Sequence, residues 1–209
     1  MSAPRRHRGG NTDTRDRLIA ATEEIMLEEG YAAATSRRIA AKSGVNPALV
    51  HYYFPTLIDL FVAVFRRGAE ANLTRQREAL ACESSLHKLW ELAIEPRGTA
   101  LFLEFMALGN HRKEIRSEIA GYIERFREGQ LAALTLILHR RGIDVEALPP
   151  AVISILITSA GRTITMESDM DVTSGHQELH AFIGDFLRFA EGQPWQRQFI
   201  RPPERTQQQ

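Results

Sequence analysis

The 209-residue sequence predicts an all-α protein, in which a small N-terminal three-helix domain with a helix-turn-helix precedes a larger C-terminal helical domain. Three observations predict this fold class. Apolar side chains recur at helical spacing through nearly all of residues 13–191. No segment alternates apolar and polar residues as a half-buried strand would. Glycine and proline clusters interrupt the helical pattern at residues 95–98, 109–110, 141–142 and 148–150.

The helices follow in order from these signals. The first is expected over residues 13–29, because Leu18, Ala21 and Ile25 share one face. Gly30 then ends it in the left-handed conformation that glycine tolerates. Further helices are expected over residues 36–43, 46–54, 57–81, 85–94, 99–109, 113–141, 150–170 and 174–191.

Four segments are expected along the chain. Residues 1–12 form a disordered basic arm, residues 13–58 the helix-turn-helix domain, residues 59–195 the second helical domain and residues 196–209 a flexible tail. The boundary between the two domains falls inside the fourth helix, because no loop separates them. The arm either contacts nucleic acid through its arginines or only adds solubility.

Composition excludes several classes of protein. The 26 basic and 26 acidic residues give no net charge, but residues 1–12 and 35–55 contain basic residues and no acid. The single cysteine excludes an intramolecular disulfide and suits a reducing compartment. No apolar run reaches the roughly 20 residues of a membrane span, and no apolar stretch follows the charged N-terminus as in a signal peptide. We therefore expect a cytoplasmic protein without a membrane partner.

The most informative segment is the helix-turn-helix at residues 35–54. Its second helix has a well-defined start, because Asn46 can accept hydrogen bonds from the first turn and Pro47 occupies the first helical position. Val50 and Phe54 face the core at i and i+4. The outer face then carries small, apolar and hydrogen-bonding side chains that suit a DNA major groove. These residues are Pro47, Ala48, Leu49, His51, Tyr52 and Tyr53.

Two arginines support the same interpretation. Thr35 caps the start of the first helix of the helix-turn-helix, residues 36–43. Arg37 and Arg38 lie in the first turn of that helix, where the helix dipole disfavours cations. A nearby phosphate would reverse that penalty, whereas the alternative is that both arginines are solvated surface residues.

Residues 13–61 resemble the DNA-binding domain of the TetR family of transcriptional regulators. The matching features are Glu29-Gly30-Tyr31, Thr35, Ile39-Ala40, Gly44-Val45, Tyr52-Tyr53-Phe54-Pro55 and Leu60-Phe61. The resemblance implies a base or phosphate contact from Arg37 and base contacts from the residues at 47–49. It also implies a phosphate contact from His51, where the family commonly has tyrosine. Two residues depart from the family: Leu57 replaces a phosphate-binding lysine, and Arg38 replaces a capping acid.

From both arguments, the helix-turn-helix is expected to bind double-stranded DNA. The DNA-binding residues are predicted to be Thr35, Ser36, Arg37, Arg38, Asn46, Pro47, Ala48, Leu49, His51, Tyr52 and Tyr53.

The second domain is expected to bind a ligand. Its large side chains from four helices either line an apolar pocket or simply form the core. The predicted ligand-binding residues are Trp90, Phe102, Phe105, Met106, Tyr122, Phe126, Arg162 and Met166. Arg162 lies in an apolar helix and needs a partner. That partner is either an anionic ligand or an internal acid such as Glu104 or Glu167, and the internal acid is the favoured alternative.

The last two helices carry apolar stripes. These are Ile153, Ile157, Ala160 and Ile164, followed by Leu179, Phe182, Ile183, Phe186 and Phe189. The family resemblance implies that the two helices pack against their copies and form a homodimer. A dimer is also physically sensible, because a single helix-turn-helix makes few contacts and a two-fold dimer contacts two half-sites.

Signals for an enzyme are poor. His176 and His180 are four residues apart, but the glutamate between them is at position 178 and not directly after the first histidine, so a solvated helix face is favoured over a metal site. Cys82 and His87 lack a third orienting group. We expect neither a cofactor nor a metal.

The predicted function is a ligand-responsive repressor that binds a palindromic operator as a dimer and is released by a small lipophilic effector, such as a lipophilic acid or an acyl thioester. Two alternatives remain open at the level of sequence. One is a DNA-binding regulator without an effector, and the other is an all-helical enzyme or carrier.

Overall fold

The computed structural model describes residues 9–82 and 85–194, and within these residues it contains helices and no strands. The elements are α1 (Gly9–Glu29), the 3-10 turn η1 (Tyr31–Ala33), α2 (Ser36–Ser43), α3 (Pro47–Tyr53), α4 (Leu57–Leu80), α5 (Ser85–Ala93), α6 (Pro96–Gly109), α7 (Lys113–Arg140), α8 (Pro150–Ser168) and α9 (His176–Ala190). The predicted all-α fold class is confirmed. Within the described residues, no single helix is long and apolar enough to cross a membrane.

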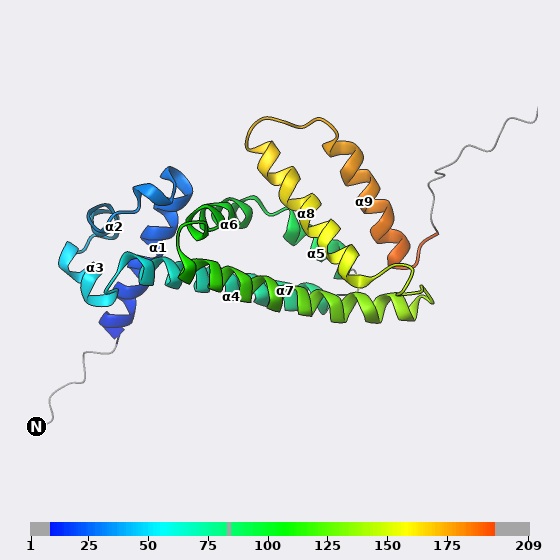
Figure 1. The fold of residues 1–209 in the computed structure, drawn as a ribbon, viewed down its shortest axis with the longest axis horizontal. Coiled ribbons are helices and arrows are strands. Elements are labelled where there is room, and N and C mark those ends of the chain that lie inside the picture. Colours follow the sequence, from blue (N-terminus) through cyan, green and yellow to red (C-terminus); the bar gives the residue numbers. More distant parts are fainter. Residues whose placement is uncertain (1–8, 83–84, 195–209) are drawn as a thin grey trace, which may run out of the picture.

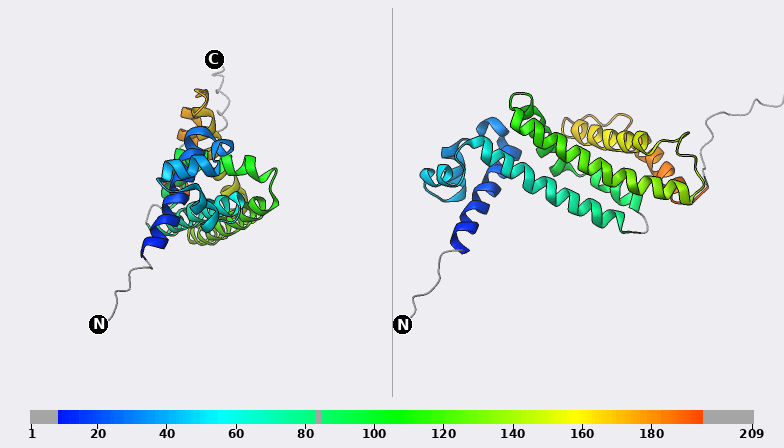
Figure 2. Two further views of the ribbon diagram at one scale, coloured as in Figure 1. Left: turned by 90° about the vertical axis from the view of Figure 1, so that its left-hand side faces the viewer. Right: turned by 60° about the horizontal axis from the view of Figure 1, so that its bottom comes forward.

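Helices α1–α3 lie together at one end of the molecule, and α8 and α9 lie toward the other (Figure 1). The long helices α4 and α7 run side by side between the two ends, as two views show (Figures 1 and 2). A reciprocal capping box fixes the start of α4: the Asp59 amide donates to the Thr56 hydroxyl over 3.1 Å, and the Thr56 amide donates to the Asp59 carboxylate over 2.9 Å.

Two helices begin earlier than the sequence predicts. Helix α1 begins at Gly9 instead of residue 13, so the predicted arm keeps only residues 1–8, which lie outside the described residues. Helix α6 begins at Pro96 instead of residue 99. Glu95 caps it by accepting hydrogen bonds from the amides of Arg97 and Gly98 at 3.0 and 2.7 Å, and Pro96 occupies the first helical position. The expected break between the two helices does occur, at residues 94 and 95, but it ends before Pro96 instead of extending to residue 98.

The apolar core has two parts. The first joins the helix-turn-helix to the second domain, because Leu18, Ile39 and Leu60 belong to the same buried cluster as Phe105 and Ile115. The second holds α5, α7, α8 and α9 together. The buried apolar side chains of α1 therefore share one core with those of α6 and α7, and α1 contacts α6 directly, so movement of α6 would disturb the helix-turn-helix.

The stripes predicted to face a second copy belong largely to the second core. Ile153, Ile157 and Ile164 are only 3–6% exposed, and Ile183 is 7% exposed. That part of the prediction is wrong, because the strongest apolar stripe of each helix covers its own chain first. A different set of apolar residues on α8 is exposed, namely Val152, Ile155, Leu156 and Met166.

Gly161 marks the close approach of α8 to α5. A Cβ atom at this position would lie 2.6 Å from the Ala93 carbonyl oxygen, a contact with backbone that cannot rotate away. We expect Gly161→Ala to lower the free energy of unfolding by about 1–3 kcal/mol through overpacking. Urea denaturation measures this, with Gly121→Ala as the control, because a Cβ atom there meets nothing within 4 Å. Equal losses in both variants would contradict the explanation.

Candidate nucleic-acid interface and ligand pocket

The helix-turn-helix is capped as the sequence predicts. The Thr35 hydroxyl accepts a hydrogen bond from the Arg38 amide at 3.3 Å, and Gly44 ends α2 with φ of 67°. The Asn46 side chain accepts from the Ala48 amide at 2.9 Å, with Pro47 at the first position of α3. These caps fix the angle between the two helices.

The predicted faces of α3 are also confirmed. Val50 and Phe54 are 1% and 4% exposed and lie in the first core. The outer residues Pro47, Ala48, Leu49, His51 and Tyr52 are exposed, while Tyr53 is half-buried. The rings of Tyr52 and Tyr53 pack edge to face with centroids 5.1 Å apart. Side chains able to contact base edges thus project from α3, and the contacts themselves remain a prediction.

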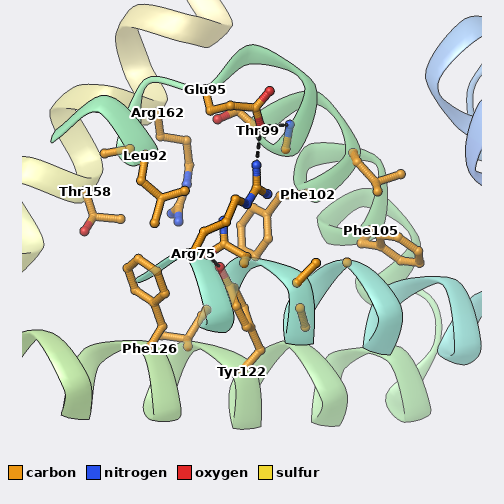
Figure 3. A pocket seen from close by; sticks show the side chains of 18 of the residues that line it. Arg75, Leu92, Glu95, Thr99, Phe102, Phe105, Tyr122, Phe126, Thr158 and Arg162 are labelled. Atoms are coloured by element: carbon orange, nitrogen blue, oxygen red, sulfur yellow. Dashed lines mark hydrogen bonds and ion pairs between the residues drawn. The ribbon is translucent and has the colours of Figure 1, made fainter. Parts of the chain in front are cut away.

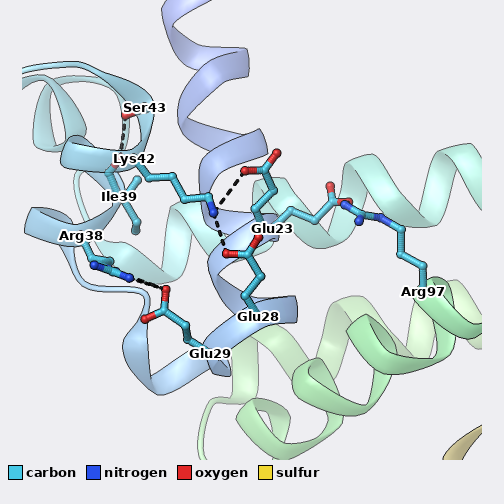
Figure 4. A network of polar contacts seen from close by, with 9 residues as sticks. Glu23, Glu28, Glu29, Arg38, Ile39, Lys42, Ser43 and Arg97 are labelled. Carbon is cyan, nitrogen blue, oxygen red and sulfur yellow. Dashed lines mark hydrogen bonds and ion pairs between the residues drawn. The ribbon is translucent and has the colours of Figure 1, made fainter. Parts of the chain in front are cut away.

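Acids of α1 pair with two of the three cations on α2. Arg38 donates to Glu29 at 2.7 Å, and Lys42 contacts Glu28 at 2.7 Å and Glu24 at 3.4 Å (Figure 4). Although residues 35–55 contain no acid, acidic side chains of α1 therefore lie on the same surface. Both cations would have to exchange carboxylates for phosphates in order to bind DNA.

Arg37 has a different environment. It is exposed, and none of the carboxylates in the described part of the chain lies within ion-pair distance of it. Sequence reasoning missed a further cation, Arg15 of α1, whose guanidinium lies 5.1 Å from the centroid of the Phe54 ring at the end of α3. Leu57, which replaces the family's lysine, is partly buried against the first core. Arg15 and Arg37 therefore supply positive charge near α3.

A cavity of about 390 Å³ is bounded by α4, α5, α6, α7 and α8 of the second domain and by Glu23 of α1. Five predicted ligand-binding residues line it, namely Phe102, Phe105, Tyr122, Phe126 and Arg162 (Figure 3). Burial raises the pKa of Tyr122 to about 12, so its hydroxyl is protonated at neutral pH and donates to the Asn72 side-chain oxygen at 2.9 Å.

Three predicted ligand-binding residues do not line this cavity. Trp90 is 7% exposed and belongs to the second core, where its ring lies 5.5 Å from that of His180. Met106 and Met166 are 41% and 38% exposed at the surface. Apolar residue type alone did not distinguish the core, the cavity and the surface, which depend on the direction of each side chain from its helix.

Arg162 lacks the internal acid that we favoured. Glu104 instead accepts a hydrogen bond from the Tyr31 amide at 2.6 Å, and Glu167 pairs with His176 at 2.7 Å. Within residues 9–82 and 85–194, no carboxylate lies within ion-pair distance of Arg162. Its guanidinium lies 4.5 Å from the centroid of the Phe102 ring, and burial lowers its pKa. The internal-acid hypothesis was wrong.

The charge around the cavity is positive. Its lining includes five arginines, at positions 67, 75, 97, 127 and 162, but only two glutamates, at positions 23 and 95. Arg75 is 4.0 Å from Glu95, and Glu23 pairs with Arg67 and Arg97. Arg162 thus faces a partly apolar cavity that attracts anions. Within the described residues, no group of three or more metal-ligating side chains could hold a metal ion.

Comparisons with known proteins agree with this organisation. Residues 18–64 match the model of the bacterial regulatory proteins of the tetR family. The transcriptional repressor BepR of Brucella suis is 23% identical over 193 residues, which cover 88% of this chain and 83% of that protein. The transcriptional activator FasR of Mycolicibacterium smegmatis is 28% identical over 93 residues, which cover 43% of this chain and 42% of that protein.

The fold also has counterparts among solved structures. A transcriptional regulator from Saccharomonospora viridis, solved in complex with choline, aligns with a TM-score of 0.70 at 20% identity. The alignment covers 85% of this chain and 96% of that one. At this level of identity the likeness concerns the fold.

Proposed function

Because this chain carries the TetR-family DNA-binding domain within a TetR-like fold, we propose that it represses transcription by binding a palindromic operator as a homodimer, and that a small lipophilic anion releases it. The observation that carries the effector part is Arg162, a half-buried cation with an aromatic neighbour and no carboxylate within ion-pair distance among the described residues, at the wall of a cavity. Like other proteins that bind chromosomal operators, it would act in the cytoplasm.

The dimer is proposed to form through the last two long helices. Val152, Leu156 and Met166 of α8 are each at least 38% exposed, and Phe182 of α9 is 37% exposed. A monomer that leaves such large apolar residues in water gains free energy by covering them with a second copy. A two-fold dimer would place its recognition helices about 34–36 Å apart, one turn of B-DNA.

The effector is proposed to combine an anionic group with an apolar body. Its anionic group would take two parallel hydrogen bonds from the Arg162 guanidinium, whose central carbon lies over the Phe102 ring, 4.5 Å from the ring centroid. Its apolar part would contact Tyr122 and Phe126. A lipophilic carboxylic acid or an acyl thioester with an anionic group fits this description.

DNA binding is tested with a duplex selected by the protein itself from a random pool. We expect two chains per duplex and an affinity that falls as salt rises. Arg37→Ala should make the slope of log affinity against log salt shallower by about 1 per subunit, because one phosphate contact is lost. Arg140→Ala, at the far end of α7, is the matched control and should leave the slope unchanged. Binding that does not depend on salt would contradict the proposal.

A further inference from the structure

We infer that Glu23 is an internal competitor of the effector, and that its displacement from Arg67 and Arg97 transmits occupancy of the cavity to the helix-turn-helix. This inference rests on the proposed function. It names the contact through which the same cavity would regulate DNA binding.

Glu23 joins three helices at the wall of the cavity. One oxygen of its carboxylate contacts Arg67 of α4 at 2.5 Å. The other contacts Arg97 of α6 at 2.9 Å, and Figure 4 shows Glu23 and Arg97 pointing toward each other. All three residues line the cavity. The Glu23 side chain is 18% exposed, whereas those of Arg67 and Arg97 are 39% and 60% exposed. A carboxylate from the first helix of the DNA-binding domain therefore forms part of the ligand pocket.

Glu23 holds its position as an anion. Burial raises the pKa of its carboxyl, but hydrogen bonds and charge from Arg67 and Arg97 outweigh burial and leave the pKa below its usual value. An effector carboxylate paired with Arg162 would lie in the same cavity as Arg67 and Arg97, and it would also be attracted by the charge of these two guanidinium groups. Two carboxylates in one cavity repel each other and compete for its positive charge, so effector binding and the Glu23 contacts oppose each other.

The consequence reaches the helix-turn-helix because, besides their apolar packing, α6 holds it through two polar contacts. One is the Glu23–Arg97 pair, and the other is the hydrogen bond from the Tyr31 amide to Glu104 at 2.6 Å. Only the first borders the cavity, since Glu104 is not among its lining residues. When Glu23 loses its partners, its largely buried charge becomes unfavourable unless α1 shifts toward water. An anion in the cavity would thus change the placement of α1 relative to α6.

The test uses two variants that remove opposite ends of the same contact, with decanoate as the anionic probe and decanol as its uncharged match. Both Glu23→Gln and Arg97→Gln should weaken binding to the selected duplex about two- to tenfold, because each loosens α1 from α6. The two variants should change the affinity for decanoate in opposite directions. Glu23→Gln removes the competitor and should tighten decanoate binding about two- to tenfold, whereas Arg97→Gln removes a cation and should weaken it. Decanol affinity should stay unchanged in both.

The factor by which decanoate lowers duplex affinity should also shrink toward one in Glu23→Gln, because affinity coupling between two sites is reciprocal. Glu104→Gln is the control, because it changes a contact of α6 that lies away from the cavity. Its decanoate affinity, and the factor by which decanoate lowers its duplex affinity, should equal those of the wild type. Thermal melting checks that each variant is folded. If decanoate releases wild-type protein from DNA and Glu23→Gln responds identically, this inference is overturned while the proposed function stands. If decanoate does not bind the wild type better than decanol, the proposed class of effector is wrong, and the inference that rests on it is wrong too.

Discussion

Replacing Phe105 by alanine is expected to lower the free energy of unfolding by about 3–5 kcal/mol. Phe105 is 1% exposed, and its ring packs edge to face on Phe65 with centroids 5.0 Å apart. It also lies in the core that joins α1 and α4 to α6. Truncation to alanine would leave a void beside the existing cavity. Because few neighbouring atoms can move into this void, the loss of stability should be large.

Urea denaturation followed by circular dichroism measures this loss. Met106→Ala is the matched control, because Met106 is the next residue of the same helix and is 41% exposed. We expect the control to change stability by less than about 1 kcal/mol. Similar losses in the two variants would mean that α6 does not present Phe105 to the core as described.

Replacing Arg162 by leucine is expected to weaken decanoate binding about 10- to 100-fold and to leave decanol binding nearly unchanged. The basis is that a hydrogen bond to a charged group contributes about 1.5–3 kcal/mol. The free energy of unfolding should change little, because within the described residues no carboxylate pairs with Arg162 and none would lose its cation. Leucine keeps an apolar contact with Phe102.

Isothermal titration calorimetry with both probes measures this difference, and Arg140→Leu on the exposed end of α7 serves as the control for removal of a positive charge. A decanoate affinity that is the same in wild type and Arg162→Leu would remove Arg162 from the ligand site. A large loss of stability without ligand would instead indicate that Arg162 supports the fold.

Much of the helix-turn-helix could be predicted because its signals are local. Asn46, Pro47 and Gly44 act on backbone groups within a few residues, so their effects can be seen in a short stretch of sequence. The two faces of α3 follow from helical period, which placed Val50 inside and Tyr52 outside. The same local signals placed one boundary too late, because the break before α6 ends at Glu95 and Pro96 already begins the helix.

The ligand pocket was only partly predictable because its contacts join distant parts of the chain. Glu23 and Arg97 are 74 residues apart, and no spacing rule connects them. Arg162 was identified as a charge in an apolar helix, but its surroundings depend on how α6 and α8 pack. The apolar period of α8 could not reveal whether Ile157 faces its own core or a second copy, since both environments favour the same residue types.

If an anion in the helical domain controls DNA binding by the helix-turn-helix, the anion must release the duplex. The most direct measurement is titration of decanoate into the complex of wild-type protein with its selected duplex, at constant ionic strength, followed by fluorescence anisotropy of the duplex. We expect decanoate to release the duplex over the concentration range in which it binds the free protein, and decanol to leave the duplex bound. A duplex that stays bound while decanoate saturates the protein would show that the anion does not control DNA binding.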